Sequence, residues 1–133
     1  MDEQSKTGLE KLTELTSKLT SDPYSALDRT FDLSPDLLCV LDGQGGFIKT
    51  SKAWTTELGW TSEELRSNPW VFFLHPDDIA PSIACYEEAT KAGKTTTNFI
   101  NRYRCADGTY KSLVWSLPGI QDGTVFSVAR IQK

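Results

Sequence analysis

The sequence has few residues that could build a metal site or a disulfide framework. Its 133 residues include one histidine and three cysteines. Cys39, Cys85 and Cys105 lie far apart along the chain, and an odd, widely spaced set fits neither a disulfide framework nor zinc-ligand spacing. A single histidine also excludes sites built on two histidines. We therefore expect no metal site and three reduced thiols.

Long apolar runs and an excess of positive charge are also missing. No stretch approaches the roughly 20 apolar residues needed to cross a bilayer, and the first residues lack the basic-then-apolar order of a signal peptide. The formal net charge is -4 at pH 7, so the chain has no global positive field for nucleic acid or anionic lipid. We expect a cytoplasmic protein that binds neither nucleic acid nor a membrane.

The apolar content is sufficient for one folded domain preceded by a helix. Leu, Ile, Val and Phe make up about 23% of the chain, above the roughly 20% below which chains tend to stay disordered. Residues 1–22 are expected to form an amphipathic helix, because leucines recur there at helical spacing. Such a short helix needs cover from the domain or from a second copy. The domain itself is expected to span residues 23–133.

The pattern of residues 23–133 predicts an α+β fold. A short helix is expected from Pro23, and helix-start signals follow at Thr50 or Ser51, at Thr61 and at Pro81. The Thr61 signal is a capping box with Glu64. Strand-like runs, separated by glycine-containing turns, lie at 37–41, 47–48, 95–104, 110–117 and 124–131. We expect a five-stranded antiparallel sheet with short helices on one face and an N-terminal amphipathic helix.

Short motifs recur in a familiar order between Phe31 and Gln132. They are Leu41-Asp42-Gly43, Ala53-Trp54, Leu58-Gly59-Trp60, His75-Pro76-Asp77-Asp78 and Asn101-Arg102-Tyr103-Arg104. In this order and spacing they resemble a PAS domain with its C-terminal motif. The resemblance implies a sensor of a small ligand, light, redox state or a partner, as in two-component signal transduction. Because the chain has no room for a kinase, cyclase or DNA-binding unit, the output is expected in a fused portion or a separate partner.

The resemblance also implies a pocket between the sheet and the helices. Its candidate lining residues are Trp54, Leu58, Trp70, Phe72, Ile83, Tyr86, Phe99 and Tyr103. These large side chains either fill the hollow or frame a cavity for a small-molecule ligand, and the sequence leaves both open. We expect no cofactor first and a flavin next, because apolar walls suit a flat aromatic molecule. A haem is less expected, since the family's axial histidine position, on the central helix, holds Cys85 and Tyr86 here.

A second surface is expected to pair two copies of the chain. The strand 109–116 carries apolar residues on both faces, which implies that both faces are covered. The helices cover one face, and the leading helix or a second subunit is expected to cover the other. The candidate homodimer residues are Leu9, Leu12, Leu15, Leu19, Tyr24, Leu27, Leu113 and Trp115.

No residue set predicts catalysis. His75 lies directly before Pro76, at a helix start, and the pairs Asp77-Asp78 and Glu63-Glu64 also lie at helix starts, where the helix dipole favours carboxylates. Adjacent residues on a helix do not face each other. We therefore expect a non-catalytic sensor module, and the alternative is a ligand-free domain that only pairs subunits.

Overall fold

The computed structural model describes residues 8–11 and 23–133. The chain divides into two compact units, residues 1–31 and 32–133. In the first unit residues 8–11 are helical and Leu9 is exposed. Helix α2, Pro23–Leu33, begins at Pro23 as predicted and exposes Leu27. The remaining interface candidates of the leading helix, Leu12, Leu15 and Leu19, lie outside the described residues, so their role stays a prediction.

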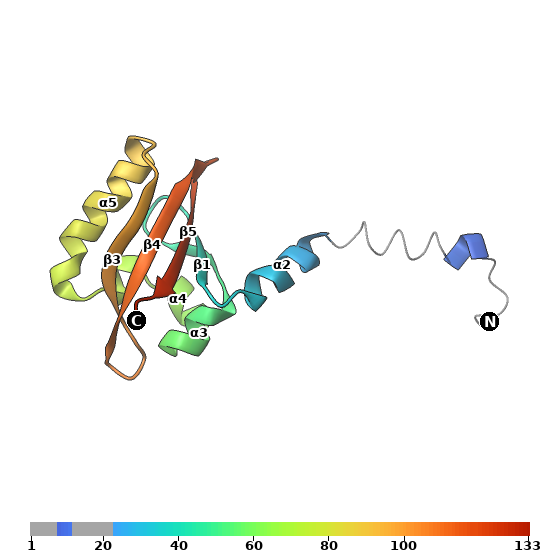
Figure 1. The fold of residues 1–133 in the computed structure, drawn as a ribbon, viewed down its shortest axis with the longest axis horizontal. Helices are drawn as coiled ribbons and strands as arrows, with labels where there is room; N and C mark the ends of the chain where they lie inside the picture. The colour runs from blue at the N-terminus through green and yellow to red at the C-terminus, as the bar shows by residue number, and fades with distance from the viewer. Residues whose placement is uncertain (1–7, 12–22) are drawn as a thin grey trace. The chain divides into compact units, whose positions relative to one another are not determined.

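The second unit contains the predicted five-stranded antiparallel sheet (Figure 1). The strands occur in the order β2-β1-β5-β4-β3, which places the first strand of the chain beside the last. The pairing of β1 with β5 closes the fold, because it joins the N-terminal hairpin to the C-terminal three strands. The bounds are β1 Leu37–Leu41, β2 Phe47–Thr50, β3 Thr96–Arg104, β4 Tyr110–Gln121 and β5 Thr124–Ile131.

Strand β4 is longer than predicted. The sequence suggested an end at Leu117, directly before Pro118. The strand instead continues to Gln121, and its register against β5 shifts between Ser116 and Gly119. An irregularity of this kind is where a sheet tolerates a proline.

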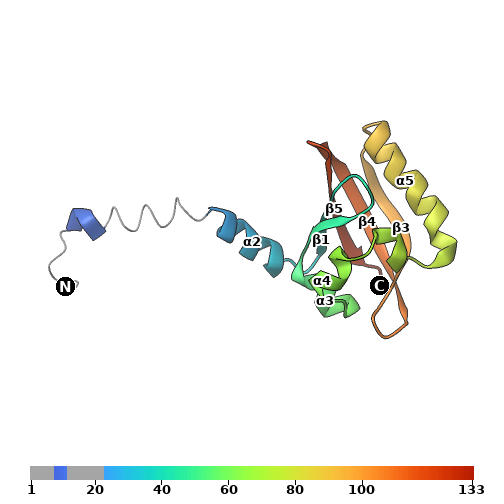
Figure 2. The same cartoon turned by 180° about the vertical axis from the view of Figure 1, so that it is seen from behind.

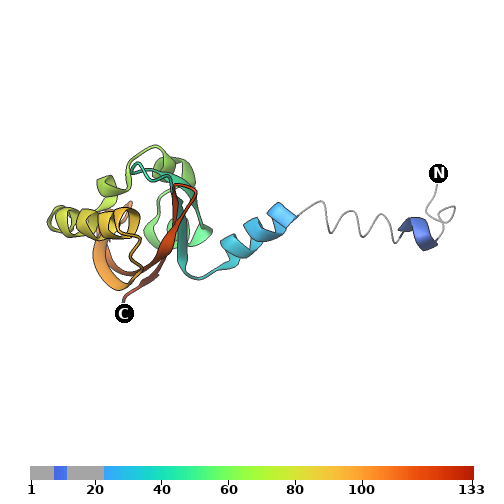
Figure 3. The same cartoon turned by 90° about the horizontal axis from the view of Figure 1, so that it is seen from above.

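All the helices between β2 and β3 lie on one face of the sheet (Figures 2 and 3). Helix α3 ends at Gly59, whose φ of 88° is the left-handed conformation that glycine adopts freely. Thr61 and Glu64 form the predicted capping box at the start of α4. The bounds are α3 Lys52–Leu58, α4 Ser62–Arg66, η2 Trp70–Phe73, η3 Pro76–Asp78 and α5 Ile79–Lys91.

Two helix starts differ from the prediction. Helix α5 begins at Ile79, two residues before Pro81, because the first helical N–H groups need no partner within the helix and a proline there costs little. Ser51 occupies the N-cap position of α3, but its side chain does not cap that helix. Its hydroxyl instead accepts a hydrogen bond from the Leu38 N–H and donates to the Asp36 carbonyl. Ser51 therefore ties the start of α3 to β1.

The core lies between the helices and the concave face of the sheet, and it contains two residues predicted for the dimer interface. Leu113 is 0% exposed and Trp115 is 4% exposed, and both belong to this core. The predicted interface role of these two residues is therefore wrong. The two faces of β4 are both apolar, so the sequence could not say which face the helices cover. It is Val114 that lies on the opposite face.

The N-terminal end of α5 is joined to β3 through Asp78. The Asp78 carboxylate accepts three hydrogen bonds, all donated by Arg102. The donors are the backbone N–H at 2.7 Å, Nε at 2.9 Å and Nη2 at 2.8 Å. The Arg102 side-chain hydrogen bonds lower the pKa of the Asp78 carboxyl, with its backbone hydrogen bond and charge adding to the effect. The ionised form of Asp78 is thus the one that the fold stabilises.

We expect Asp78→Asn to lower the free energy of unfolding by about 1–2 kcal/mol at pH 7, because charge-assisted hydrogen bonds are lost from a partly exposed pair. The folded pKa of Asp78 lies below the unfolded value of about 3.9, so its contribution is present above pH 4 and disappears as the pH falls further. Urea unfolding at pH 7 and pH 3 should show the wild-type advantage shrinking in acid. Asp77→Asn, with a mostly exposed side chain, is the control. An advantage that persists at pH 3 would contradict this assignment.

Candidate functional site

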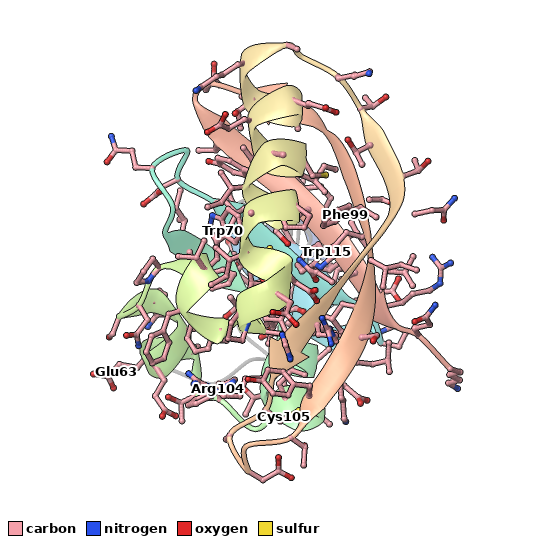
Figure 4. The ribbon with its side chains drawn as sticks, turned by 90° about the vertical axis from the view of Figure 1, so that its left-hand side faces the viewer. Glu63, Trp70, Phe99, Arg104, Cys105 and Trp115 are labelled. Atoms are coloured by element: carbon pink, nitrogen blue, oxygen red, sulfur yellow. The ribbon has the colours of Figure 1, made fainter. Side chains whose placement is uncertain are left out.

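A half-open cavity of about 40 Å³ lies in the second unit, between α5 and the concave face of the sheet. In Figure 4, Trp70 lies to one side of α5, and Phe99 and Trp115 lie to the other. We call this space the core cavity. It is lined by Cys39, Leu41, Phe47, Trp70, Ser82, Cys85, Tyr86, Phe99, Asn101, Tyr103, Trp115, Leu117 and Ser127.

Four of the eight predicted pocket residues line the core cavity: Trp70, Tyr86, Phe99 and Tyr103. The other four lie elsewhere. Trp54 and Leu58 are fully buried in the core but do not reach the lining. Ile83 is 37% exposed, and Phe72 is 48% exposed beneath the Arg104 guanidinium, whose carbon lies 4.8 Å from the ring centre. The prediction was wrong for these four because the apolar character of a side chain does not say which way it points.

Sequence reasoning missed the lining residues contributed by alternate strand positions. Residues 39 and 41 of β1, 101 of β3, 115 and 117 of β4 and 127 of β5 all face the cavity, as a period of two along each strand requires. That period was visible in the sequence. What the sequence did not show was that small polar residues, Ser82, Asn101 and Ser127, sit among the apolar ones.

A buried hydrogen-bond network fixes one wall of the core cavity. The side-chain Nδ2 of Asn101 donates to Ser82 Oγ at 3.1 Å, and Trp115 Nε1 donates to the side-chain Oδ1 of Asn101 at 2.7 Å. The three residues come from β3, α5 and β4, and all are buried. Because a satisfied polar network in a low-dielectric interior is rigid, this wall is held in one arrangement.

Three other polar atoms around the core cavity have no partner. Trp70 Nε1, Tyr86 Oη and Ser127 Oγ are buried without a hydrogen bond, and each of these residues lines the cavity. The rings of Trp70 and Tyr86 lie against each other with centroids 5.3 Å apart. Most buried polar groups in proteins are paired, and each unpaired one costs free energy.

The core cavity is electrically neutral at pH 7. Of the described residues that line it, none is Asp, Glu, Lys, Arg or His. Burial raises the pKa of the Tyr103 hydroxyl and of the Cys39 thiol. Burial, and then the charge of Asp42, raises the pKa of Tyr86, and burial raises that of the Cys85 thiol. The hydroxyls and thiols are therefore protonated.

The lining does not fit a flavin or a haem. About 40 Å³ holds a few water molecules at roughly 10–15 Å³ each, whereas a flavin ring system has many more atoms. His75 Nδ1 accepts a hydrogen bond from the Asp77 N–H at the start of η3 and does not line the cavity.

Across residues 8–11 and 23–133, no group of three or more His, Cys, Asp and Glu side chains is placed to hold a metal ion. None of the helices in the part of the chain that the structure describes has the length and apolar character needed to span a membrane.

The convex face of the sheet carries an apolar surface, which we call the outer sheet face. Phe99 and Asn101 line the core cavity, so Ile100 between them points the other way, and the same alternation places Phe126 and Val128 around Ser127. Ile100 is 47% exposed and Phe126 is 41% exposed. The strand register aligns Leu38 with Val128 and Val40 with Phe126. The outer sheet face comprises Leu38, Val40, Ile100, Val114, Phe126 and Val128.

Comparison with known proteins gives one family and a consistent fold. The sequence model described as PAS fold matches residues 47–129. The structure of a PAS domain of an HTR-like protein from Haloarcula marismortui has a TM-score of 0.69 and 20% identity, covering 90% of this chain and 99% of that chain. A domain of a sensory box sensor histidine kinase/response regulator from Geobacter sulfurreducens has a TM-score of 0.69 and 20% identity, over 84% of this chain and 93% of that one.

A third similar structure holds a ligand. The PAS domain of a quorum-sensing receptor from Cronobacter turicensis, in complex with C12:0, has a TM-score of 0.66 and 10% identity over 75% of this chain and 96% of that chain. At these identities the likeness is one of fold. A search of the curated proteins found no match.

Proposed function

Because this chain belongs to the PAS family, we propose that it is a non-catalytic sensory module that binds a small molecule in the core cavity and relays its presence through the sheet. The observation that carries the proposal is that three strands serve two surfaces. β3, β4 and β5 supply Asn101, Trp115 and Ser127 to the cavity, and their neighbours Ile100, Val114 and Phe126 form the outer sheet face. A change in cavity packing therefore acts on the strands that present that face.

We propose that the outer sheet face pairs two copies of the chain in the cytoplasm. Isolated apolar side chains are normal at a surface, but an apolar band is typical of an interaction site. This band is interrupted by Ser116, opposite Val128, and by Arg130, opposite Val114. Ile100 and Phe126 are the most exposed members of this band. The predicted leading helix would add Leu12, Leu15 and Leu19 to the same contact. The output unit of the module would then lie outside this chain, in a fused portion or in a partner protein of a signalling system.

The non-catalytic role is supported by what the ionisable side chains do in the fold. The Asp78 carboxylate is engaged by Arg102, and His75 accepts a hydrogen bond at the start of η3. Glu64 is part of the capping box of α4. Three of the side chains that the sequence offers as acids and bases, those of Asp78, His75 and Glu64, thus have structural partners.

The small size of the core cavity favours a second candidate function, a ligand-free domain that only pairs subunits. The aromatic rings of Trp54, Tyr103 and Trp115 pack together beside the cavity, with centroids 5.4–5.9 Å apart, and fill most of the hollow. The two functions share the dimer and differ in the relay. A sensor requires cavity packing to change pairing, whereas a pure assembly domain does not.

Sedimentation equilibrium on the full chain tests the relay without any ligand. Phe126→Glu should weaken pairing at least tenfold, because a charge would be buried in an apolar contact. Ser127→Val, which changes only the cavity side of the same strand, should change the dimer dissociation constant at least threefold. Phe72→Glu, at similar exposure on the helical side, is the control and should leave pairing unchanged.

Each outcome separates the candidates. A response to Phe126→Glu but not to Ser127→Val would favour the pure assembly domain. A sedimenting mass that is the same for wild type and Phe126→Glu would remove the outer sheet face as the dimer contact.

A further inference from the structure

We propose that the ligand of the core cavity is a small uncharged molecule with a hydrogen-bond acceptor that binds the indole N–H of Trp70, with the hydroxyls of Tyr86 and Ser127 as its further partners. This inference rests on the proposed function, because it names the chemical class of the molecule that the cavity would sense.

The four tryptophans differ in whether the indole N–H has a hydrogen-bond acceptor. Three of the four indole N–H groups donate to a protein acceptor: Trp54 to the Leu38 carbonyl at 3.0 Å, Trp60 to the Arg104 carbonyl at 2.7 Å and Trp115 to Asn101 at 2.7 Å. Trp70 is only 7% exposed, yet its Nε1 has no partner. An indole N–H can only donate, so the group that satisfies Trp70 must be an acceptor.

The other two unpaired atoms, Tyr86 Oη and Ser127 Oγ, belong to different elements around the same cavity. Tyr86 lies on α5 and Ser127 on β5, so with Trp70 of η2 the three groups come from three elements that surround one cavity. Each hydroxyl can donate or accept. One molecule with an acceptor and a second polar atom can therefore satisfy groups that the protein leaves unpaired.

The apolar part of the lining argues for an organic molecule over water alone. A buried water needs two to four polar partners, so water could satisfy the three unpaired groups alone, whereas Leu41, Phe47, Phe99 and Leu117 offer no partner at their positions around the cavity. The Asn101 amide is already engaged by Ser82 and Trp115. A molecule with a short apolar portion and a polar end matches both kinds of wall.

Charge and size narrow the class further. No charged side chain lines the core cavity among the described residues, so an ionised carboxylate or ammonium would lose its hydration without a counter-charge. A volume of about 40 Å³ has room for about three to four water-sized groups, so a small organic molecule fits only if the walls adjust slightly. A short primary amide meets these limits, and its carboxylate analogue of equal size does not.

The test uses propionamide and propionate, which have the same number of non-hydrogen atoms and differ in charge. The full chain labelled with ¹⁵N gives four indole N–H signals, one for each tryptophan. At pH 7, propionamide at tens of millimolar should move the Trp70 signal in a saturable way, while propionate at equal concentration leaves it in place. The Trp60 signal, from an indole outside the cavity, serves as the internal control.

Variants connect the signal to the three groups. Trp70→Phe removes the signal and assigns it. Tyr86→Phe and Ser127→Ala should each weaken the propionamide response at least threefold. Tyr86→Phe and Ser127→Ala each delete an unpaired hydroxyl, so without ligand both variants should have a melting temperature no lower than that of the wild type. This measurement separates loss of a ligand contact from loss of the fold.

Two results would overturn the inference. If propionate moves the Trp70 signal as strongly as propionamide, the cavity selects an anion and the proposed class is wrong. If neither compound moves it, the unpaired groups do not bind such a molecule. Neither result would contradict the proposed coupling between cavity packing and pairing. That coupling is tested separately, by the sedimentation of Ser127→Val without a ligand.

Discussion

Trp54→Ala is expected to lower the free energy of unfolding by about 3–5 kcal/mol, the range for truncation of a large buried aromatic side chain. Trp54 is 0% exposed and stands at the centre of the aromatic core. Its ring packs edge-on against Phe47 at 5.2 Å and Tyr103 at 5.4 Å between centroids, and it also contacts Trp115. The variant would leave a cavity that no neighbouring element is free to fill.

Part of this loss comes from a hydrogen bond. Trp54 Nε1 donates to the Leu38 carbonyl, which also accepts from the Ser51 backbone N–H. Trp54→Phe keeps most of the ring but not the donor, so its cost should be smaller than that of alanine. Urea unfolding at pH 7, followed by far-ultraviolet circular dichroism, measures both values.

The matched control is Phe72→Ala, which truncates an aromatic residue that is 48% exposed. Its cost should stay near 1 kcal/mol, because less apolar area returns to water. Equal losses for Trp54→Ala and Phe72→Ala would mean that Trp54 is not the centre of the core.

Local sequence signals predicted most of the elements of this fold because their causes are local. The capping box of Thr61 and Glu64 and the left-handed Gly59 depend on residues within a few positions of each other. The turns at Asp107-Gly108 and Asp122-Gly123 separate the last three strands as expected. Such features need no knowledge of distant parts of the chain.

The predictions that failed depend on long-range packing. Leu113 and Trp115 share one face of β4, as strand alternation predicts. Only the position of helices such as α5 decides that this face points inward. The same applies to Ile83 and Phe72, whose apolar side chains remain partly exposed. A sequence period gives two faces and does not say which of them is covered.

The sequence predicted only part of the lining of the core cavity. The rest was missed for a related reason. Large rings such as Trp70 and Tyr86 attract attention in a sequence, whereas Ser82 and Ser127 look like surface residues. Their burial follows from strand alternation and from the Asn101 network. The polar character of the cavity, on which its ligand class depends, thus became visible only when the strands were placed side by side.

Asn101→Leu is expected to lower the free energy of unfolding by about 2–4 kcal/mol, although leucine is apolar and similar in size. Asn101 accepts from Trp115 Nε1 and donates to Ser82 Oγ. The substitution would leave two buried polar groups without these partners, at about 1–3 kcal/mol for each unsatisfied group. Urea unfolding of the wild type and the variant measures the loss.

A double-mutant cycle with Ser82→Ala tests whether the loss arises from the network. Ser82→Ala alone should cost about 1 kcal/mol, since one hydrogen bond is removed. In the double variant the Ser82 hydroxyl can no longer be left unpaired, so the combined loss should be smaller than the sum of the two single losses. Strict additivity would mean that Asn101 and Ser82 act independently. The Trp115 indole signal should move in both variants that carry Asn101→Leu and stay in place in Ser82→Ala, because only Asn101 is its acceptor.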